Sequence, residues 1–301
     1  MNYKKVFKNQ QLRFAILRLF SFIPDPIMLK WQYRIKMGYK LNLKNPQRFT
    51  EKIQIYKLYY RNSVLPVCVD KYEVRNYVAS CGLKHLLNEL YGVYAKPTDI
   101  NFEILSQKFV IKTTDGTGGQ NVFVCKDKAL LNVPQLLSEL AAWKDKKNIN
   151  AGREWAYTGI KESKYIIEKY LENDPIEGLL DYKFFVFDGK VFCVQLDKDR
   201  YTTHKRNIYD SNWNLMNVSC SYPNEQMEIP KPECWEELVT VAEILGKAFP
   251  FVRVDLYLVD RKIYFGELTF YPGSGYEGYI PDNFDFELGR QFNISSFYKN
   301  K

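Results

Sequence analysis

Short apolar stretches, several of them alternating apolar and polar residues with a period of two, predict β-strands over the middle and C-terminal parts of this chain. Two of the stretches are long enough to fold back on themselves as hairpins. The first has Asp188–Gly189 at its centre, a pair that favours a two-residue turn. The predicted strands are 109–112, 122–125, 165–168, 181–187 with 191–195, and the two arms of a second hairpin over 251–270.

Helices are predicted where apolar residues recur every three to four positions. Thr50 begins one of them, and Asp70 caps another, which ends near Gly82. Helices and strands do not alternate regularly, so an α+β fold around antiparallel sheets fits better than a doubly wound parallel sheet. The predicted helices are 50–58, 70–78, 136–143 and 235–248.

The composition is that of a folded globular protein. With 301 residues, 46% of them hydrophobic, the chain can bury a substantial core split between two or three lobes. The six cysteines are widely separated, and the two histidines, His85 and His204, cannot supply a zinc site with the usual ligand spacing. Isolated cysteines without a recognisable cleavable signal are typical of reduced thiols, so we expect a cytoplasmic protein.

The net charge of +8 is concentrated at the N-terminus. Residues 1–60 contain 13 Lys and Arg and two acids, whereas the other 241 residues sum to −3. The apolar run at 12–23 is too short to span a membrane, which takes ~20 residues, and Pro24 follows it. Two interpretations stay open: a helix lying on an anionic membrane or facing a lipid-linked substrate, or a helix packed on the protein with a solvated basic face. No nucleic-acid-binding motif accompanies the charge, so we expect no nucleic-acid partner.

The hairpin over 251–270 carries the most informative polar residues. If Asp260–Lys262 is its loop, Val259 faces Ile263, Asp255 lies opposite Glu267, and Arg253 lies opposite Thr269. Opposed carboxylates repel unless a cation lies between them, and oxygen ligands suit Mg²⁺. Arg253 beside the pair could then hold a transferring phosphoryl group. Alternatively, the face is open to water and Arg253 bridges the two acids, or a one-residue slip in register separates them.

A glycine-rich segment is a second candidate site. The strand predicted to end at Lys112 is followed by DGTGGQN at 115–121, and the next strand begins at once. Gly116, Gly118 and Gly119 would leave backbone N–H groups accessible to phosphate oxygens, with Lys112 as a point charge. The spacing matches neither a Walker loop nor a dinucleotide-binding fingerprint, and an ordinary hairpin turn is the alternative.

The exit of the strand at 165–168 is a third candidate. Glu168, Lys169 and Leu171 follow an apolar run, where backbone and acid groups could receive an adenine and its ribose. An ordinary surface Glu–Lys pair is the alternative. Lys183, on the same strand face as Asp181, is either a cation for phosphate or a partner in a cross-strand salt bridge.

Taken in chain order, these segments resemble the ATP-grasp family over most of the chain. The resemblance implies ATP bound between a small lid lobe and a C-terminal lobe, with two lysines on its phosphates, a hinge glutamate region on adenine and ribose, and Asp, Glu and usually Asn holding two Mg²⁺. Thr269 stands where the family usually has Asn, which puts the second metal in doubt. The roles so implied are ATP binding by Lys71, Lys112, Gly116, Gly118, Gly119, Glu168, Lys169 and Leu171, catalysis by Lys183 and Arg253, and metal binding by Asp255, Glu267 and Thr269.

Longer motifs resemble the TupA-like branch, associated with teichuronopeptide and other surface-polysaccharide synthesis. They include FTEKIQIYKLYY, VDKYEVRNYV, REWAYTGIKESKYIIEKYL, DYKFFVFDGK and FVRVDLYLVDRKIYFGELTFYPGSG. The resemblance implies an ATP-dependent ligase that activates a uronic-acid carboxylate as an acyl phosphate and joins it to an amino acid. By its charge, the basic arm fits an acidic sugar precursor as partner, either free or lipid-linked. We expect a basic N-terminal arm (1–60), an N-terminal lobe (61–105), a lid lobe (106–170) and a catalytic lobe (171–301).

Three other functions remain compatible with the sequence. A glycosyltransferase of a polysaccharide locus would need a DxD-type acidic pair, and Asp197–Asp199 is the only such segment. A carbohydrate kinase would use the same ATP site but transfer phosphate to a hydroxyl. A non-catalytic scaffold of a polysaccharide assembly complex would not depend on Asp255.

Overall fold

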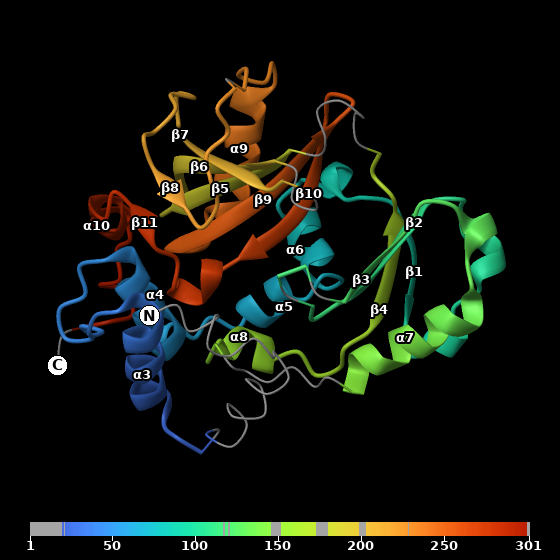
Figure 1. Cartoon of the computed structure of the whole chain (residues 1–301), viewed down its shortest axis with the longest axis horizontal. Helices are drawn as coiled ribbons and strands as arrows, with labels where there is room; N and C mark the ends of the chain where they lie inside the picture. Colours follow the sequence, from blue (N-terminus) through green and yellow to red (C-terminus); the bar gives the residue numbers. More distant parts are fainter. Residues whose placement is uncertain are drawn as a thin grey trace. The chain divides into compact units, whose positions relative to one another are not determined.

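The computed structural model describes residues 20, 22–116, 118–119, 121–145, 152–172, 180–198, 203–227 and 229–299. The chain forms two compact units (Figure 1). The larger unit comprises 1–62, 150–155 and 175–301, and the smaller unit comprises 63–149 and 156–174. The four-part division expected from the sequence stays a prediction. None of the described helices combines the length and the hydrophobicity that crossing a bilayer requires. The apolar run at 12–23 lies mostly outside the described residues.

The smaller unit is built on a four-stranded antiparallel sheet in the order β1-β4-β2-β3. Its core packs helix α7 against the sheet through side chains that include Phe109, Leu140 and Tyr165. The Tyr165 hydroxyl donates to the Leu140 carbonyl at 2.7 Å, which ties strand to helix. The elements are α5 (Leu65–Val69), α6 (Val74–Ser80), β1 (Leu90–Tyr94), β2 (Phe109–Thr113), β3 (Val122–Cys125), α7 (Val133–Asp145) and β4 (Tyr165–Lys169), with single 3₁₀ turns at Lys84–Leu86, Pro97–Asp99, Phe102–Ile104 and Lys128–Leu130.

The larger unit is built on a five-stranded antiparallel sheet in the order β10-β9-β5-β6-β7 (Figure 1). Strands β11 and β8 form a separate two-stranded ladder. Among the described residues, four helices, α3, α4, α9 and α10, belong to the same unit, and the short helix α8 has its first residue in it. The elements are α3 (Asp25–Met37), α4 (Phe49–Tyr59), α8 (Trp155–Thr158), β5 (Asp181–Phe187), β6 (Lys190–Lys198), β7 (Lys205–Asp210), β8 (Ser219–Cys220), α9 (Trp235–Gly246), β9 (Phe251–Val259), β10 (Lys262–Thr269), a 3₁₀ turn at Pro272–Gly275, β11 (Tyr279–Ile280) and α10 (Asn283–Gln291).

The two faces of the five-stranded sheet differ. On one face, apolar residues such as Phe184 pack under α9, with the Phe184 and Trp235 rings 5.6 Å apart. On the other face, Phe187 and Phe251 pack against Phe49 of α4, at ring distances of 6.0 and 4.9 Å. The remaining part of this second face is polar and includes Lys183 and Asp255. Because aromatic side chains fill only one end of it, the rest of the face is left for charged groups.

The strands predicted at 109–112, 122–125 and 165–168 are confirmed, as are both hairpins. The helix predicted from Asp70 begins only at Val74, because the Asp70 carboxylate accepts hydrogen bonds from the backbone N–H groups of Tyr72 and Glu73 and holds a turn there. The helix predicted at 235–248 ends at Gly246.

Candidate active site

A bulge in the last hairpin sets the position of its acidic residues. The turn consists of Asp260 and Arg261, both with positive φ, and Lys262 pairs directly with Val259. The predicted three-residue loop, with Val259 facing Ile263, is therefore wrong. The register then shifts by one residue at Gly266, and beyond this point Glu267 faces Asp255 and Thr269 faces Arg253, as predicted.

Gly266 allows the strands to approach closely at the bulge. A Cβ atom at this position would come within 2.9 Å of both the Asp255 carbonyl oxygen and the Tyr257 ring. No ordinary side chain fits without moving one of them. Bulges of this kind bend a strand and redirect the side chains that follow.

Arg253 bridges the two acids of the hairpin. Its Nε lies 2.7 Å from Asp255 Oδ1, and its Nη2 lies 2.7 Å from Asp255 Oδ2. The same Nη2 donates to the Thr269 hydroxyl at 3.1 Å and to Glu267 Oε1 at 3.4 Å. The Thr269 hydroxyl donates to Glu267 Oε1 at 3.0 Å. Arg253 therefore bridges the two acids, as the alternative interpretation stated, but Asp255 is buried and not open to water. The contacts also bring three oxygen-bearing side chains together: Asp255, Glu267 and Thr269.

Lys183 reaches the same carboxylate from the neighbouring strand. It pairs with Asp255 across β5 and β9, and its Nζ lies 2.7 Å from Asp255 Oδ2. The Lys183 ammonium also contacts the Asp181 carboxylate on its own strand face. Lys183 is only 4% exposed and Asp255 only 2%. Two buried cations therefore share one buried carboxylate.

The titration of these groups reflects both burial and pairing. Burial alone lowers the pKa of Arg253, but the charge and hydrogen bonds of Asp255 outweigh it and hold the pKa above its ordinary value. Burial raises the pKa of Asp255, and Arg253 and Lys183 oppose that rise.

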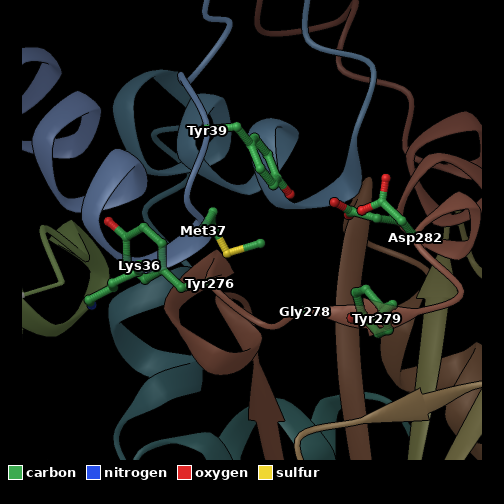
Figure 2. A pocket seen from close by; sticks show the side chains of 8 residues that line it. Lys36, Met37, Tyr39, Tyr276, Gly278, Tyr279 and Asp282 are labelled. Carbon is green, nitrogen blue, oxygen red and sulfur yellow. The ribbon is translucent and has the colours of Figure 1, made fainter. Parts of the chain in front are cut away.

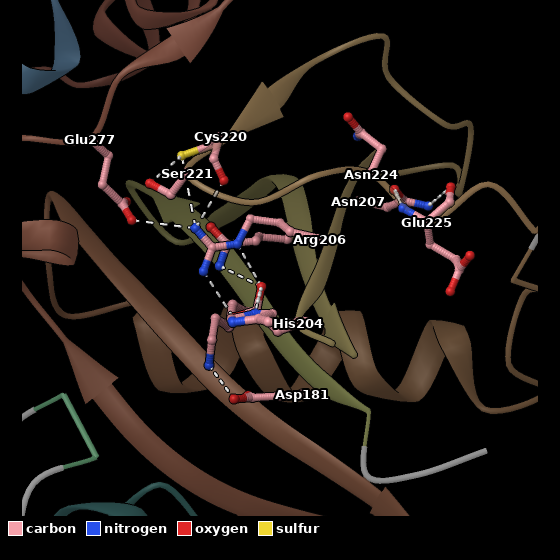
Figure 3. Close-up of polar contacts among 12 residues, drawn as sticks. Asp181, His204, Arg206, Asn207, Cys220, Ser221, Asn224, Glu225 and Glu277 are labelled. Atoms are coloured by element: carbon pink, nitrogen blue, oxygen red, sulfur yellow. Dashed lines mark hydrogen bonds and ion pairs between the residues drawn. The ribbon is translucent and has the colours of Figure 1, made fainter. Parts of the chain in front are cut away.

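A second charged network continues along the polar face (Figure 3). Arg206 on β7 lies opposite Asp197 on β6 and donates to its carboxylate at 2.6 and 3.0 Å. The other side of the guanidinium lies 3.4 Å from Glu277, and His204 Nε2 lies 3.5 Å from Asp197. Burial alone raises the pKa of Asp197, but Arg206 outweighs it and lowers the pKa below its usual range.

Sequence reasoning missed Arg206 and Glu277 as members of this face. It noted Asp197 only as part of a DxD segment. The signal that could have found the pair is the strand period, because Asp181, Asp197 and Arg206 occupy directly paired positions of three neighbouring strands. Asp199, the second acid of that segment, lies outside the described residues.

Acids outnumber bases on this polar face, which favours binding of a further cation. Mg²⁺ is held in proteins by one or two carboxylates together with water and substrate phosphates, and Asp255, Glu267 and the Thr269 hydroxyl offer oxygen atoms only. Within the described part of the chain, no three His, Cys, Asp or Glu side chains are grouped as a complete metal site. Asp255, Glu267 and Thr269 would therefore suit a magnesium ion, which prefers oxygen ligands. The acids are Asp181, Asp197, Asp255, Glu267 and Glu277, and the bases are Lys183, Arg206 and Arg253.

The smaller unit gathers a separate group of predicted residues around Glu168. Lys112 Nζ lies 3.0 Å from Glu168 Oε2. Arg75 Nη1 lies 3.2 Å from the other oxygen, Oε1. The Lys71 ammonium donates to the Gly116 carbonyl at the start of the glycine-rich segment, and the Lys71 backbone N–H donates to Thr114. The sequence did not indicate Arg75.

The remaining predicted ATP-binding residues take other positions in the smaller unit. Gly118 and Gly119 have φ values of +60° and +76°, which glycine adopts readily. Their neighbours Thr117 and Gln120 lie outside the described residues. The Lys169 side chain is 3.7 Å from Glu89 and does not join the group around Glu168. Leu171 follows β4 as a half-buried residue outside regular structure.

Comparison with known proteins identifies a family whose sequence model this chain matches. The sequence model of the family described as TupA-like ATPgrasp matches residues 51–293. Among solved structures, D-alanine–D-alanine ligase from Bacillus anthracis is similar with 20% identity, a TM-score of 0.43, and coverage of 67% of this chain and 57% of the ligase. Phosphoribosylamine–glycine ligase from Thermotoga maritima is similar with 17% identity, a TM-score of 0.42, and coverage of 77% and 56%.

The chain thus spans a little over half the length of these ligases. A comparison with curated proteins gives no match. The family assignment rests on the sequence model, which covers most of the chain, and it supports an α+β ATP-grasp fold. The chain belongs to the TupA-like ATP-grasp family.

Proposed function

We propose that the protein is an ATP- and magnesium-dependent ligase that joins an amino acid to a uronic-acid carboxylate of a cell-surface polysaccharide or its precursor. One observation supports this most strongly. Asp255 and Glu267 are paired across a bulged hairpin on a face rich in acids, in a chain of the ATP-grasp family. Two paired acids with a bridging arginine suit a site where a cation and phosphates meet.

Magnesium, held by Asp255, Glu267 and Thr269, would neutralise the phosphate charge of ATP when bound. Arg253 and Lys183 both donate to Asp255 in the structure. Both cations turn to the phosphoryl group in transfer and stabilise its developing charge.

The chemistry has two steps. A carboxylate oxygen of the sugar acid attacks the γ-phosphorus of ATP, the bond from that phosphorus to the β,γ-bridging oxygen breaks, and ADP leaves. The neutral amine of the amino acid then attacks the carbonyl carbon of the acyl phosphate. Inorganic phosphate leaves, an amide forms, and the amine loses a proton to the surroundings. Water must be kept from the acyl phosphate, a role we assign to the glycine-rich segment 113–121.

In the smaller unit, Lys71 and Lys112 are assigned to the ATP phosphates, and Gly116, Gly118 and Gly119 to backbone contacts with them. Glu168, Lys169 and Leu171 are assigned to the adenine and ribose. The Lys112–Glu168 ion pair and the Arg75 contact hold this group in place without a ligand. The Lys112 side chain is 31% exposed, so a ligand can reach it from solvent.

We further propose that the protein works in the cytoplasm, at the inner face of the membrane. Residues 1–60 carry a charge of +11, which attracts acidic glycans and anionic lipids. Helix α3 exposes an apolar stripe of Ile27, Trp31 and Ile35, with 45%, 53% and 59% of each residue accessible. These residues are four apart and lie on one side of the helix, as in helices that lie in a membrane interface.

The direct test combines Mg-ATP, a panel of amino acids and a uronic-acid glycan. Phosphate release that needs both the amino acid and the glycan supports the ligase. Asp255→Asn should reduce this release by about 100-fold or more, while Asp260→Asn in the hairpin turn serves as a matched control with normal activity. Phosphorylated sugar without free phosphate would indicate a kinase. Sugar transfer from a nucleotide donor without ATP would exclude the ligase.

A further inference from the structure

A tight left-handed turn after β10 places a serine beside a buried lysine. Gly273, Ser274 and Gly275 have φ values of +52°, +57° and +67°. Glycine adopts such values readily, whereas a serine held there is strained. Strained residues persist only where the surrounding contacts fix them, and they cluster at reactive sites. Ser274 is therefore the residue of this turn whose contacts need a chemical explanation.

Two buried side chains of α4 hold the turn from the protein interior. Gln54 Nε2 donates to the Gly275 carbonyl at 2.9 Å. Lys57 Nζ lies 2.7 Å from the Ser274 carbonyl oxygen and 3.0 Å from Ser274 Oγ. Lys57 is 1% exposed, whereas Ser274 is half-buried, so the serine is the member of this pair that reaches the surface.

The two contacts suit a neutral lysine as well as a charged one. As an ammonium ion, Lys57 donates to both oxygens of Ser274. A neutral amine keeps an N–H for the carbonyl, and its lone pair can accept the proton of the hydroxyl. Burial lowers the pKa of Lys57 from 10.5 to about 7, with Glu154 opposing and Lys36 assisting the change. A sizeable fraction of this lysine is therefore neutral at neutral pH.

The surroundings leave room beside the hydroxyl. A Cβ atom at Gly152 would lie 2.7 Å from Ser274 Oγ, so a side chain at this position would press against it. Two residues beyond Ser274, Tyr276 lines a cavity of about 220 Å³ together with Lys36 (Figure 2). Open space of this size, next to the turn in the chain, accommodates a small acyl group.

A serine hydroxyl becomes a nucleophile when an adjacent base takes its proton, and lysine is one of the bases that act in this way. We propose that Ser274 accepts an acyl group from an activated ester or acyl phosphate, with Lys57 as its general base. Lys57 Nζ takes the hydroxyl proton as Oγ attacks the carbonyl carbon. The bond from that carbon to the leaving oxygen breaks, the leaving group departs with the bonding electrons and the proton from Lys57, and the acyl group remains on Ser274 as an ester.

The test is acylation of the intact protein by p-nitrophenyl acetate in the absence of ATP. We expect nitrophenol release and, in mass spectra of the acid-quenched protein, one acetyl group on the peptide that contains Ser274. Ser274→Gly removes the hydroxyl and suits the positive φ, and it should abolish both signals. Ser80→Ala, at an exposed serine whose hydroxyl donates to the Tyr77 carbonyl, is the matched control and should react like the wild type.

The pH profile distinguishes a base from a lysine that only supports the turn. Glu154, Lys36 and the Tyr276 ring, whose centre is 4.7 Å from Nζ, face the Lys57 ammonium. Only the neutral amine can take a proton, so the acylation rate of the wild type should rise as the pH approaches the Lys57 pKa of about 7 and level off above it. Lys57→Met should react about 100-fold more slowly and show no such plateau.

The outcomes separate this activity from the ligase reaction. Acetylation of Ser274 in a protein without ligase activity supports the pair and rejects only the ligase, whereas ligase activity without acetylation of Ser274 does the reverse. A wild-type rate in Ser274→Gly, or the same plateau in Lys57→Met, overturns the assignment. The labelled peptide and the wild-type pH profile decide the question even where a variant does not fold, because acetyl groups on other residues alone, or a rate without a plateau, also overturn it.

Discussion

Replacement of Lys57 by methionine should remove a large pH dependence of stability from the larger unit. Lys57 on α4 is 1% exposed, and its ammonium donates to the backbone carbonyl and hydroxyl of Ser274 at 2.7 and 3.0 Å. Glu154 is 4.0 Å away, and the Tyr276 ring centre is 4.7 Å away. Burial lowers the pKa of Lys57 from 10.5 to about 7, with Glu154 opposing and Lys36 assisting that change.

The sign and size follow from the two pKa values. Between pH 7 and 10.5 the unfolded chain binds a proton at Lys57 that the folded protein releases, so the free energy of unfolding rises with pH. Each unit of pKa difference corresponds to ~1.4 kcal/mol. From pH 7 to 10 the wild type should gain about 3 kcal/mol from this lysine alone. Lys57→Met lacks this gain, so its stability relative to the wild type should fall across the same range.

The measurement is urea unfolding at pH 7, 8, 9 and 10 for both proteins. Lys262→Met, at an exposed position in β10, is the control for general effects of losing a lysine, and its difference from the wild type should stay constant. A constant difference between Lys57→Met and the wild type, within about 0.5 kcal/mol, would refute the reasoning, because it would mean that Lys57 keeps its ordinary pKa in the folded protein.

Three further changes test other parts of the structure. Arg75→Ala removes one of two cations on Glu168 and should raise the KM for ATP several-fold with a smaller change in kcat; an unchanged KM would show that Glu168 does not depend on it. Gly266→Val places side-chain atoms against β9 and should lower the free energy of unfolding by about 1–3 kcal/mol in urea, whereas a neutral result would contradict the close approach. Trp31→Glu should abolish sedimentation with vesicles that contain anionic lipids, while Ile104→Glu, another exposed apolar position, should not; equal binding by both variants would reject α3 as the contact.

The pairing of Asp255 with Glu267 could be predicted from the sequence, but the turn length and the regular register assumed for that prediction were wrong. A loop of three residues and a regular ladder lead to the same pair as a turn of two residues followed by a bulge. Strand period and turn signals identify which residues share a hairpin. They do not show where a glycine in the strand interior lets the register shift, because that depends on the close approach of the partner strand.

Other parts of the site depend on contacts between segments far apart in the chain. Glu277 joins Arg206 across 71 residues, and nothing in the local pattern of either segment indicates it. The start of α6 was misplaced for a different reason. Asp70 was predicted to cap this helix, but its side chain stabilises a turn before α6, whose N-cap is Glu73.

The bulge at Gly266 affects how the two acids, Asp255 and Glu267, are oriented, but it does not decide whether they are paired. If Gly266 were deleted, β9 and β10 would pair without a break beyond the two-residue turn, and the same glutamate would again face Asp255. The glycine is therefore unnecessary for bringing the acids together. What it supplies is direction, since the added twist rotates the glutamate relative to its partner. A chain shortened by this residue would keep the distance between the two acids while changing the angle between them, and so would measure how much the orientation of a ligand contributes to catalysis.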